Sequence, residues 1–365
     1  MTYKTCPICL NNNVIISIDI PFFRHLDFTT VSNNCKLLKC THCQTISNPD
    51  AVKTELSTFE GKKYADSHQT KQTMYVDGYK EPVTRSFLQA RILSEQILNN
   101  ENLRILDIGC FDGRLLVELD RIITNADLWG FDINPHLGSF FPEKDNFHFL
   151  STDLEDLEGP IDLIILSHSI LYIPDLNVLM ASISRLLKDA GTLFIQIPDI
   201  SKNIYYSLMG DQSFIFSETS LKNVIRKFGF REKVIGNNYF PRELLVSAKK
   251  YESTDSDNHI KDQIFEHNIE TIERILDQLV KMNQQNLAVL GTTVNAAFAD
   301  EILGEKLTFF VDENLSKIGE KFRGKNIVHP KNLNHKNHTL LPFGESGINI
   351  KNKFDKLYNG TFSVI

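Results

Sequence analysis

The chain has 365 residues, 42% of them hydrophobic, and this length and apolar content predict two or three domains with ordinary cores. The formal net charge of −7 argues against a general nucleic-acid binder. No apolar run reaches the roughly 20 residues of a membrane span, and the first residues, MTYKTCPICL, lack the apolar core of a signal peptide. We therefore expect a cytoplasmic monomer or weak homodimer with no nucleic-acid or membrane partner.

Four of the six cysteines form two CxxC pairs, Cys6-x-x-Cys9 and Cys40-x-x-Cys43. In a reducing compartment, paired CxxC units are typical of tetrahedral zinc held by four thiolates. A redox pair or a chance pattern is the alternative. Cys35 has no partner at ligand spacing, and we expect it to be a small packing residue. The pattern predicts a closed, structural zinc site in a module of residues 1–58, a segment too small for a core of its own.

After this module the sequence alternates between strand and helix patterns. A polar, irregular stretch at 59–80 precedes an amphipathic helix at about 82–99. Strands such as RILDIG, DLWGFDI and IDLIILSH then alternate with helices such as RLLVELDRI and LNVLMASISRLLKD. This alternation predicts a Rossmann-like, doubly wound α/β domain over residues 59–250.

A second α/β unit is predicted over residues 251–365. The polar stretch at 251–259 is typical of a linker, and a long amphipathic helix follows at about 260–285. NLAVLG, VNAAFADEIL and KLTFFVDEN then repeat the strand–helix–strand plan of the central domain, with HTLLPFG and TFSVI as further strands. The turn at Gly291 precedes a helix whose N-terminus could hold a phosphate, although a plain packing turn fits equally well.

The loop after the first strand of the central domain contains Gly109 and Gly113 in the run LDIGCFDGR. The middle glycine of the dinucleotide fingerprint G-x-G-x-x-G is missing, and so is the lysine of a phosphate-binding loop. The strand ends in an acid, Asp107. This combination favours a ligand with a charged amino group, a ribose and an adenine but no phosphate, such as S-adenosylmethionine (SAM).

Two later acids fit the same ligand. Asp132 ends the second strand, 25 residues after Asp107, where a carboxylate can accept both ribose hydroxyls. Asp153 follows the third strand and could receive the adenine amino group, with Leu154 supplying backbone contacts. Each acid alone is more often a helix cap or a solvated loop residue. Their order at successive strand ends predicts SAM binding.

These runs resemble a known family. LDIGCFDGRLL resembles motif I of class I SAM-dependent methyltransferases, and SHSILYIPDLNVLMASISRLLKDAGTLFIQIP resembles their fourth strand with the helix and strand that follow. The whole chain resembles sugar C-methyltransferases that act on nucleotide-linked deoxysugars, which combine a four-cysteine zinc module, a methyltransferase domain and a C-terminal Rossmann-like domain. The resemblance implies a SAM site made of Asp107, Gly109, Cys110, Asp112, Gly113, Asp132, Ile133, Asp153, Leu154 and Ser167.

The resemblance also implies a catalytic set. The family is expected to use a His base in an H-E-H run, a His in the loop after the fourth strand, and a Tyr ahead of the methyltransferase domain. In this chain the corresponding positions are Asp211-Gln212 for Glu-His, Tyr172 for the loop histidine and Tyr64 for the tyrosine. His168 lies four residues before Tyr172, which is one turn away if the loop is helical.

The sequence thus predicts an enzyme that transfers a methyl group from SAM to a nucleotide-sugar or related glycan precursor, whose diphosphate would lie between the central and C-terminal domains. Transfer to carbon follows the family. Because Gln212 cannot accept a proton at neutral pH, transfer to oxygen or nitrogen is also open, with His168 or Asp211 as the base. A methyltransferase of another small metabolite and a catalytically silent binder of SAM or a nucleotide-sugar are the alternatives.

Overall fold

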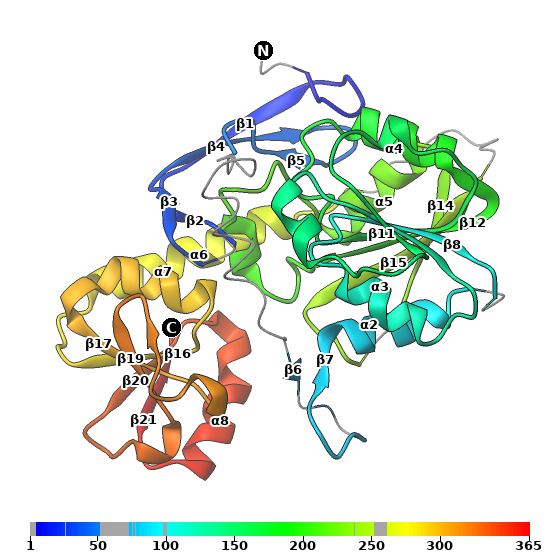
Figure 1. Cartoon of the computed structure of the whole chain (residues 1–365). Coiled ribbons are helices and arrows are strands. Elements are labelled where there is room, and N and C mark those ends of the chain that lie inside the picture. Colours follow the sequence, from blue (N-terminus) through cyan, green and yellow to red (C-terminus); the bar gives the residue numbers. More distant parts are fainter. Residues whose placement is uncertain are drawn as a thin grey trace.

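The computed structural model describes residues 5–25, 27–51, 73, 74, 76, 78–97, 101–236, 238–251 and 261–365. Figure 1 shows three parts, namely the N-terminal module in blue, the central domain in cyan to green and the C-terminal domain in yellow to red. The predicted boundary at 58/59, Tyr64 and the linker residues from 252 onward lie outside the described residues.

The central domain is built on a seven-stranded sheet with the order β10-β9-β8-β11-β12-β15-β14. The strands β8 to β12 are mutually parallel, whereas β15 runs antiparallel between β12 and β14. The parallel strands therefore bring their carboxyl ends to one edge of the sheet. The bounds are β8 Arg104–Ile108, β9 Asp127–Phe131, β10 Phe147–Leu150, β11 Ile161–Ser167, β12 Leu187–Pro198, β14 Phe230–Val234 and β15 Glu243–Lys250.

Helices cover both faces of this sheet, as the alternating pattern predicts. In β11, Leu163 and Ile165 pack with α2 and α3, whereas Ile164 and Leu166 pack with α4 and α5. Successive residues of a strand point to opposite faces, so a strand buried on both sides is a continuous apolar run. The helices are α2 Arg85–Ser94, α3 Arg114–Asp120, α4 Leu176–Leu186 and α5 Glu218–Lys227, with the 3-10 helices η1 Pro135–Phe140, η2 Leu154–Asp156 and η3 Ile204–Leu208.

The C-terminal domain is a second α/β unit with a six-stranded sheet in the order β18-β19-β17-β16-β20-β21. All neighbouring strands are parallel except β18 and β19. α6 and α7 pack on one face and α8 on the other, so the Rossmann-like prediction is confirmed. The elements are α6 Ile264–Lys281, β16 Leu287–Leu290, α7 Val294–Leu303, η4 Gly304–Lys306, β17 Leu307–Val311, η5 Leu315–Lys317, β18 Lys321–Phe322, β19 Lys325–Val328, η6 Pro330–Asn332, β20 His338–Leu341, η7 Gly344–Ser346, α8 Gly347–Leu357 and β21 Thr361–Val364.

The described residues of the N-terminal module do not form a separate core. Its sheet, β1-β4-β5, is extended by β13 from the central domain. Ile8 packs into the core under α4 and α5, whereas the fully buried Phe22 and Phe23 pack with Phe265 of α6 and Phe298 of α7. The module is thus stabilised by both domains. Its strands are β1 Asn13–Ile18, β2 Phe22–Phe23, β3 Thr30–Ser32, β4 Cys35–Cys40 and β5 Ile46–Ser47; β13 is Phe214–Ile215, and β6 Thr73–Met74 pairs with β7 Val83–Thr84.

Three predicted helix boundaries are corrected. The helix expected at 82–99 is α2, which begins after Thr84, whose hydroxyl caps it by accepting a hydrogen bond from the Phe87 N–H at 3.2 Å. The helix expected at 260–285 spans Ile264–Lys281. The helix expected to reach Asp189 ends at Leu186, because Leu187 is extended and pairs with Ile161 in the sheet.

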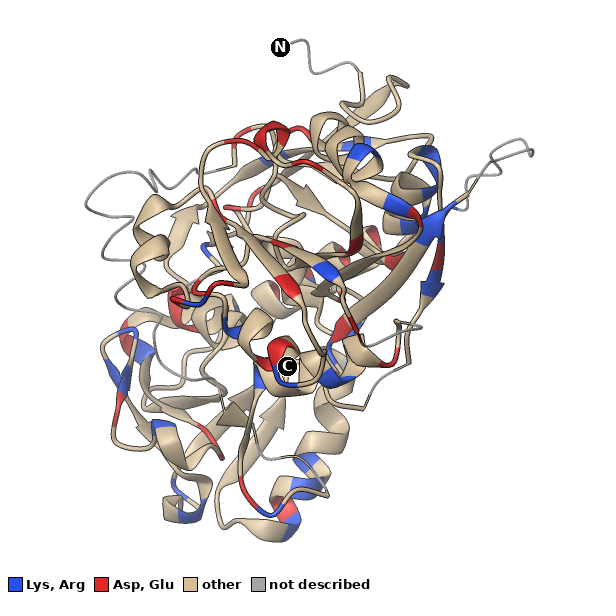
Figure 2. Cartoon of the chain, turned by 45° about the vertical axis from the view of Figure 1, so that its right-hand side comes forward, with Lys and Arg blue, Asp and Glu red and all other residues tan. Residues whose placement is uncertain are grey.

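Charged residues of both signs are interspersed over the ribbon of the described chain in Figure 2. This distribution agrees with a composition of 39 basic and 46 acidic residues. Among the described residues, no helix combines the length and apolar character that crossing a bilayer requires.

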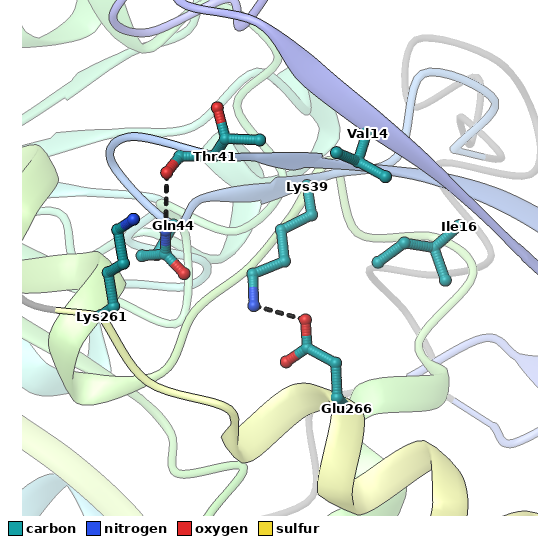
Figure 3. A pocket seen from close by; sticks show the side chains of 7 residues that line it. All are labelled: Val14, Ile16, Lys39, Thr41, Gln44, Lys261 and Glu266. Atoms are coloured by element: carbon teal, nitrogen blue, oxygen red, sulfur yellow. Dashed lines mark hydrogen bonds and ion pairs between the residues drawn. The ribbon is translucent and has the colours of Figure 1, made fainter.

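A cavity of about 420 Å³ lies where β1 and β4 of the module face the start of α6. Figure 3 shows Val14 and Ile16 at one side of it and the ion pair between Lys39 and Glu266 at its centre. The remaining lining residues are Thr41, Gln44 and Lys261. This cavity belongs to the junction between the module and the C-terminal domain and is lined by none of the predicted site residues.

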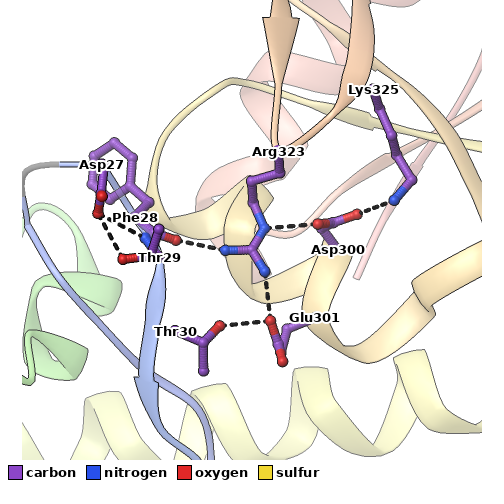
Figure 4. Close-up of polar contacts among 8 residues, drawn as sticks. All are labelled: Asp27, Phe28, Thr29, Thr30, Asp300, Glu301, Arg323 and Lys325. Carbon is purple, nitrogen blue, oxygen red and sulfur yellow. Dashed lines mark hydrogen bonds and ion pairs between the residues drawn. The ribbon is translucent and has the colours of Figure 1, made fainter.

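Arg323 of the C-terminal domain fastens the turn between β2 and β3 (Figure 4). Its Nη1 donates a 2.6 Å hydrogen bond to the carbonyl oxygen of Phe28, and its Nε donates to Asp300 Oδ2 at 2.7 Å. Its Nη2 pairs with Glu301, whose carboxylate also accepts a 2.6 Å hydrogen bond from the Thr30 hydroxyl. A single guanidinium therefore joins α7 to the N-terminal module.

We expect Arg323→Ala to lower the free energy of unfolding by about 2–4 kcal/mol, because it removes the guanidinium from a largely buried contact with two carboxylates. Asp300 would keep Lys325 as a partner, and Glu301 would keep the Thr30 hydroxyl. Arg121→Ala is the control, since the Arg121 side chain is 65% exposed and its pair with Glu118 is worth little. Urea unfolding followed by circular dichroism measures both variants. Equal midpoints for the two variants would contradict the importance of this contact.

Candidate functional site

The loop after β8 brings backbone close to its neighbours. Gly109 and Gly113 have φ angles of 82° and 76°, in the left-handed region that favours glycine. A Cβ atom at Gly109 would lie 2.5 Å from the Cβ of Ser169, and one at Gly113 would lie 2.7 Å from the Phe141 ring. Both positions therefore require glycine, for conformation and for space.

Asp107, near the end of β8, is a buried acid whose charge has no ion-pair partner among the described residues. Its side chain is 3% exposed, and its Oδ1 has no hydrogen-bond partner among the described residues. Burial, together with the nearby charge of Asp132, raises the pKa of Asp107 to about 7. The hydroxyl of Ser169, which adjoins Gly109, is also buried without a partner among the described residues. Unsatisfied buried groups are costly, so these two atoms mark a place where a ligand donor or acceptor would bind favourably.

Asp132 follows β9 and presents its carboxylate at the same edge. Its Oδ2 accepts a hydrogen bond from the Phe111 N–H at 3.2 Å, and its Oδ1 accepts one from the Asn134 N–H at 3.0 Å. Burial raises the pKa of Asp132, and these two hydrogen bonds oppose that rise. Each oxygen keeps acceptor capacity for a further donor. Ile133 beside it is 63% exposed, which leaves an apolar surface open next to the acid.

The remaining predicted cofactor residues lie around the same sheet edge. Asp153 follows β10, is exposed and caps η2 by accepting a 3.0 Å hydrogen bond from the Glu155 N–H, while Leu154 is buried. Ser167 ends β11, and its hydroxyl accepts a 2.9 Å hydrogen bond from Gln89 of α2. The predicted set therefore comes together from the ends of four neighbouring strands.

Two residues of the glycine loop itself have structural contacts. Cys110 is buried, with its Sγ 3.6 Å from the carbonyl oxygen of Phe111. Asp112 pairs with the Arg114 Nε at 2.6 Å at the start of α3. Their side chains hold the loop, so contacts from these positions to a ligand would come from the backbone.

A group of charged side chains lies beyond the end of β11. His168 has a φ of 61°, so the loop is not helical there, contrary to the condition set for bringing His168 one turn from Tyr172. The His168 Nε2 lies 2.9 Å from Arg85 Nη2 and 3.1 Å from Glu243 Oε2. Arg85 donates to both carboxylate oxygens of Glu243, at 2.8 and 2.6 Å. Burial alone would raise the pKa of Glu243, but the hydrogen bonds from His168 and Arg85 outweigh it and hold that pKa well below its usual range.

His25 of the N-terminal module reaches this group. Its ring is nearly parallel to that of His168, with centroids 6.3 Å apart and an interplanar angle of 17°. Its backbone N–H donates a 3.0 Å hydrogen bond to Asp211 Oδ2. Burial and the neighbouring His168 lower the pKa of His25 to about 4, whereas burial raises the pKa of Asp211 to about 6.

Tyr172 and Gln212, predicted from their alignment positions, lie together. The Gln212 amide is 3.4 Å from the Tyr172 hydroxyl, and the Ser213 hydroxyl donates to the carbonyl oxygen of Tyr172 at 3.3 Å. Tyr64, the remaining predicted catalytic residue, lies outside the described residues. The structure therefore places Tyr172 beside Gln212 and Asp211 beside the backbone of His25.

Sequence reasoning missed His25, Arg85 and Glu243. Glu243 carried a signal, because it starts the apolar strand RELLV, and Gln196 interrupts the apolar run LFIQIP in the neighbouring β12. The Gln196 amide donates to Glu243 at 2.5 Å, so these two polar residues in apolar strands compensate each other. His25 carried no such signal, because its partners lie more than 140 residues away in the chain.

The two CxxC pairs meet as the spacing predicts. The sulfur atoms of Cys6, Cys9, Cys40 and Cys43 all lie within 4.8 Å of one another. The Cys40 Sγ also accepts hydrogen bonds from the N–H groups of His42 and Cys43, each at 3.4 Å. Cys35 is not part of the cluster. Four thiols at these distances could hold a tetrahedral metal ion.

At the turn that contains Gly291, the side chain of the next residue, Thr292, makes hydrogen bonds within the protein. The Thr292 hydroxyl donates to Asp312 Oδ2 at 2.7 Å and accepts a 2.6 Å hydrogen bond from Lys317. Gly291 has a φ of 100°, which explains the glycine by conformation. The alternatives of a phosphate site and a packing turn stay open.

Comparison with known proteins agrees with this geometry. Residues 83–232 match the family model described as a methyltransferase domain. A segment of 111 residues is 25% identical to trans-aconitate 2-methyltransferase of Deinococcus radiodurans and covers 30% of this chain and 43% of that protein. The chain thus spans less than half the length of this relative.

Two solved structures are similar to part of the chain. A SAM-dependent methyltransferase from Archaeoglobus fulgidus is 20% identical, with a TM-score of 0.37 over 46% of this chain and 95% of its own. One from Aquifex aeolicus is 17% identical, with a TM-score of 0.36 over 43% of this chain and 87% of its own. Residues 83–232 thus match a methyltransferase domain, and the strand order of the central sheet, with the antiparallel β15 between β12 and β14, is that of an α/β Rossmann-like methyltransferase fold.

Proposed function

We propose that the edge of the central sheet binds SAM through the residues predicted from the sequence. The observation that carries this proposal is the uncompensated Asp107 beside two glycines that admit no side chain. A carboxylate with a free oxygen suits a charged amino group, and Asp132 with its open acceptor sites suits a ribose diol. Ile133 offers an apolar surface for an adenine ring.

SAM would supply an electrophilic methyl group, and the acceptor would be held beyond the end of β11. We propose a nucleotide-linked sugar or related glycan precursor as the acceptor. The support is the three-part order of a cysteine module, a methyltransferase domain and a Rossmann-like domain, and the contact of His25 with the group around His168. The second candidate is a small organic acid, because the Deinococcus radiodurans relative is named for trans-aconitate.

The cysteine cluster suits Zn²⁺, and we propose a structural role for it. Zinc prefers four thiolates in closed structural sites, at about 2.3 Å from each sulfur. All four sulfurs converge within the module, and Cys6 and Cys43 are buried with the core under α4 and α5. The cytoplasmic location and the monomeric or weakly dimeric state expected from the sequence remain part of this proposal.

The function is tested with labelled SAM and a panel of nucleotide-sugars plus trans-aconitate, with products read by mass spectrometry. We expect one acceptor class to gain a methyl group, and Asp132→Ala to lose turnover because the ribose contact is removed. Binding of SAM in calorimetry without any methylated product would favour the silent binding protein. No SAM binding at all would contradict the proposed site.

Asp107→Asn should make the ligand-free protein more stable while it weakens SAM binding. The pKa of Asp107 is raised from 3.8 to about 7, so the folded carboxylate costs stability that grows as pH rises from about 4 to 7. We expect a gain on the order of 1–3 kcal/mol at pH 8 that vanishes near pH 4, and at least about a tenfold loss of SAM affinity. Thermal unfolding from pH 4 to 8 and calorimetry measure these effects.

The control for that experiment is Asp145→Asn, because Asp145 is exposed and has no ion pair among the described residues. It should change neither stability nor SAM affinity. A loss of stability in Asp107→Asn at pH 8 would show that the carboxylate is compensated by contacts within the protein.

Removal of one cysteine ligand should release the metal. Cys40→Ser is expected to lower the zinc content from about one ion per chain to well below half, and to reduce stability by several kcal/mol because metal binding is coupled to folding. Cys35→Ser is the matched control from the same module, since Cys35 lies outside the cluster. Elemental analysis of anaerobically purified protein decides the question, and equal zinc in both variants would rule the site out.

A further inference from the structure

His25 lies near the end of β11, and neither of its ring nitrogens has a hydrogen-bond partner among the described residues. We infer that His25, which the N-terminal module contributes, removes the proton of the methyl acceptor. This inference rests on the methyl transfer proposed above and narrows the acceptor to a group that must lose a proton, either a hydroxyl or a C–H beside a carbonyl.

The position of His25 places it against the proposed donor site. Its ring faces His168, which directly follows Ser167 at the end of β11. The next residue, Ser169, adjoins Gly109 in the loop that carries the predicted SAM contacts. An acceptor held between His25 and this loop would therefore contact both the base and the donor site.

The other candidate bases are already engaged or enclosed. The His168 Nε2 is within hydrogen-bond distance of both Arg85 and Glu243, and its Nδ1 is buried. The Asp211 Oδ2 accepts the His25 N–H, and its Oδ1 is buried. The Gln212 amide is not basic. His25 is partly exposed, as His168 and Asp211 are, but it differs from both because neither of its ring nitrogens has a hydrogen-bond partner among the described residues, whereas each of the other two side chains has one engaged polar atom.

The surroundings keep His25 in the form that accepts a proton. Its pKa is lowered to about 4 by burial and by His168, with Arg85 acting in the same direction and Glu243 opposing. Asp211, Arg24 and Asp27 are the other charged groups around the turn. Between pH 5 and 8 the ring is therefore neutral, which is the form that can accept a proton.

The chemical step balances with this single base. The acceptor proton moves to a ring nitrogen of His25 as the freed electron pair of the acceptor forms a bond to the methyl carbon. The electrons of the breaking bond between carbon and sulfur go to the sulfonium sulfur, which becomes the neutral thioether of S-adenosylhomocysteine. The imidazolium then releases its proton to water.

The turn that carries His25 is held by the C-terminal domain. Arg323 donates to the carbonyl oxygen of Phe28, three residues after His25 (Figure 4). The Phe28 N–H in turn donates to the carbonyl oxygen of Arg24 at 2.9 Å, which closes the turn. Arg323 is thus a positioning residue for the proposed base.

The test uses full-length protein and three readouts. Turnover is measured with labelled SAM and the acceptor found in the panel, and affinity for S-adenosylhomocysteine is measured by calorimetry. Reaction of each histidine with diethyl pyrocarbonate at pH 5.5 is followed by peptide mass spectrometry. His25→Asn is the test variant, and His267→Asn is the control because His267 is exposed on α6.

We expect His25→Asn to lower turnover about 10²- to 10⁴-fold, with affinity for S-adenosylhomocysteine within about twofold of the original protein. At pH 5.5, His25 should react with diethyl pyrocarbonate about tenfold faster than free histidine, which is about 90% protonated there, because the lowered pKa of His25 keeps its ring neutral. Arg323→Ala should lower turnover too, and should add little further loss in the double variant with His25→Asn.

Turnover by His25→Asn at more than about a third of the original rate would overturn the inference, and so would slow labelling of His25. The two proposals fail differently. If S-adenosylhomocysteine binds but the panel yields no product, the proposed methyl transfer fails, and the labelling rate still decides whether His25 has the free, neutral nitrogen on which the inference depends.

Discussion

The short turn from Arg24 to Thr29 is the constraint on which the arrangement of the three parts depends. The central domain holds it through the Asp211 carboxylate, which accepts the His25 N–H, and the C-terminal domain holds it through Arg323. Phe22 and Phe23, just before the turn, are completely buried between the parts. Because a small module with a cysteine cluster cannot bury enough apolar surface alone, its position is fixed by its neighbours. The same contacts that stabilise the module bring His25 to the sheet edge.

Two carboxylates at this edge, Asp107 and Glu243, have opposite pKa shifts. Glu243 receives hydrogen bonds from His168 and Arg85, which hold its pKa well below its usual range. Asp107 has an oxygen without a partner among the described residues, and its pKa is raised. A carboxylate with hydrogen-bond and ion-pair partners is stable in its charged form. A buried carboxylate without such partners pays a desolvation cost, which a bound cationic ligand can offset. The contrast separates the region that holds the proposed acceptor base from the region that would hold the donor.

Local sequence patterns predicted much of the fold, because hydrophobic periodicity and glycine positions depend on interactions between residues close in the chain. The four residues LIIL, Leu163 to Leu166, are apolar on both faces of the strand, and they form the centre of β11 in the middle of the sheet. The glycines of LDIGCFDG are required by positive φ angles and by close neighbours, and both conditions belong to the loop itself. Boundaries were less well predicted: the helix pattern that continues to Asp189 gives way at Leu187, because pairing with Ile161 across the sheet outweighs helix propensity.

The sequence by itself determined the α/β class, the cysteine cluster and the order of acids at successive strand ends, since spacing along the chain fixes periodicity, ligand sets and strand–loop junctions. Only the tertiary structure decided which side chains meet at the edge of the central sheet. His25, Arg85, His168 and Glu243 come from four distant segments, and no local pattern encodes their contact. Packing between the three parts brings these side chains together. The hydrophobic effect that drives this packing is non-directional, so it leaves no local sequence pattern from which the polar contacts could be predicted.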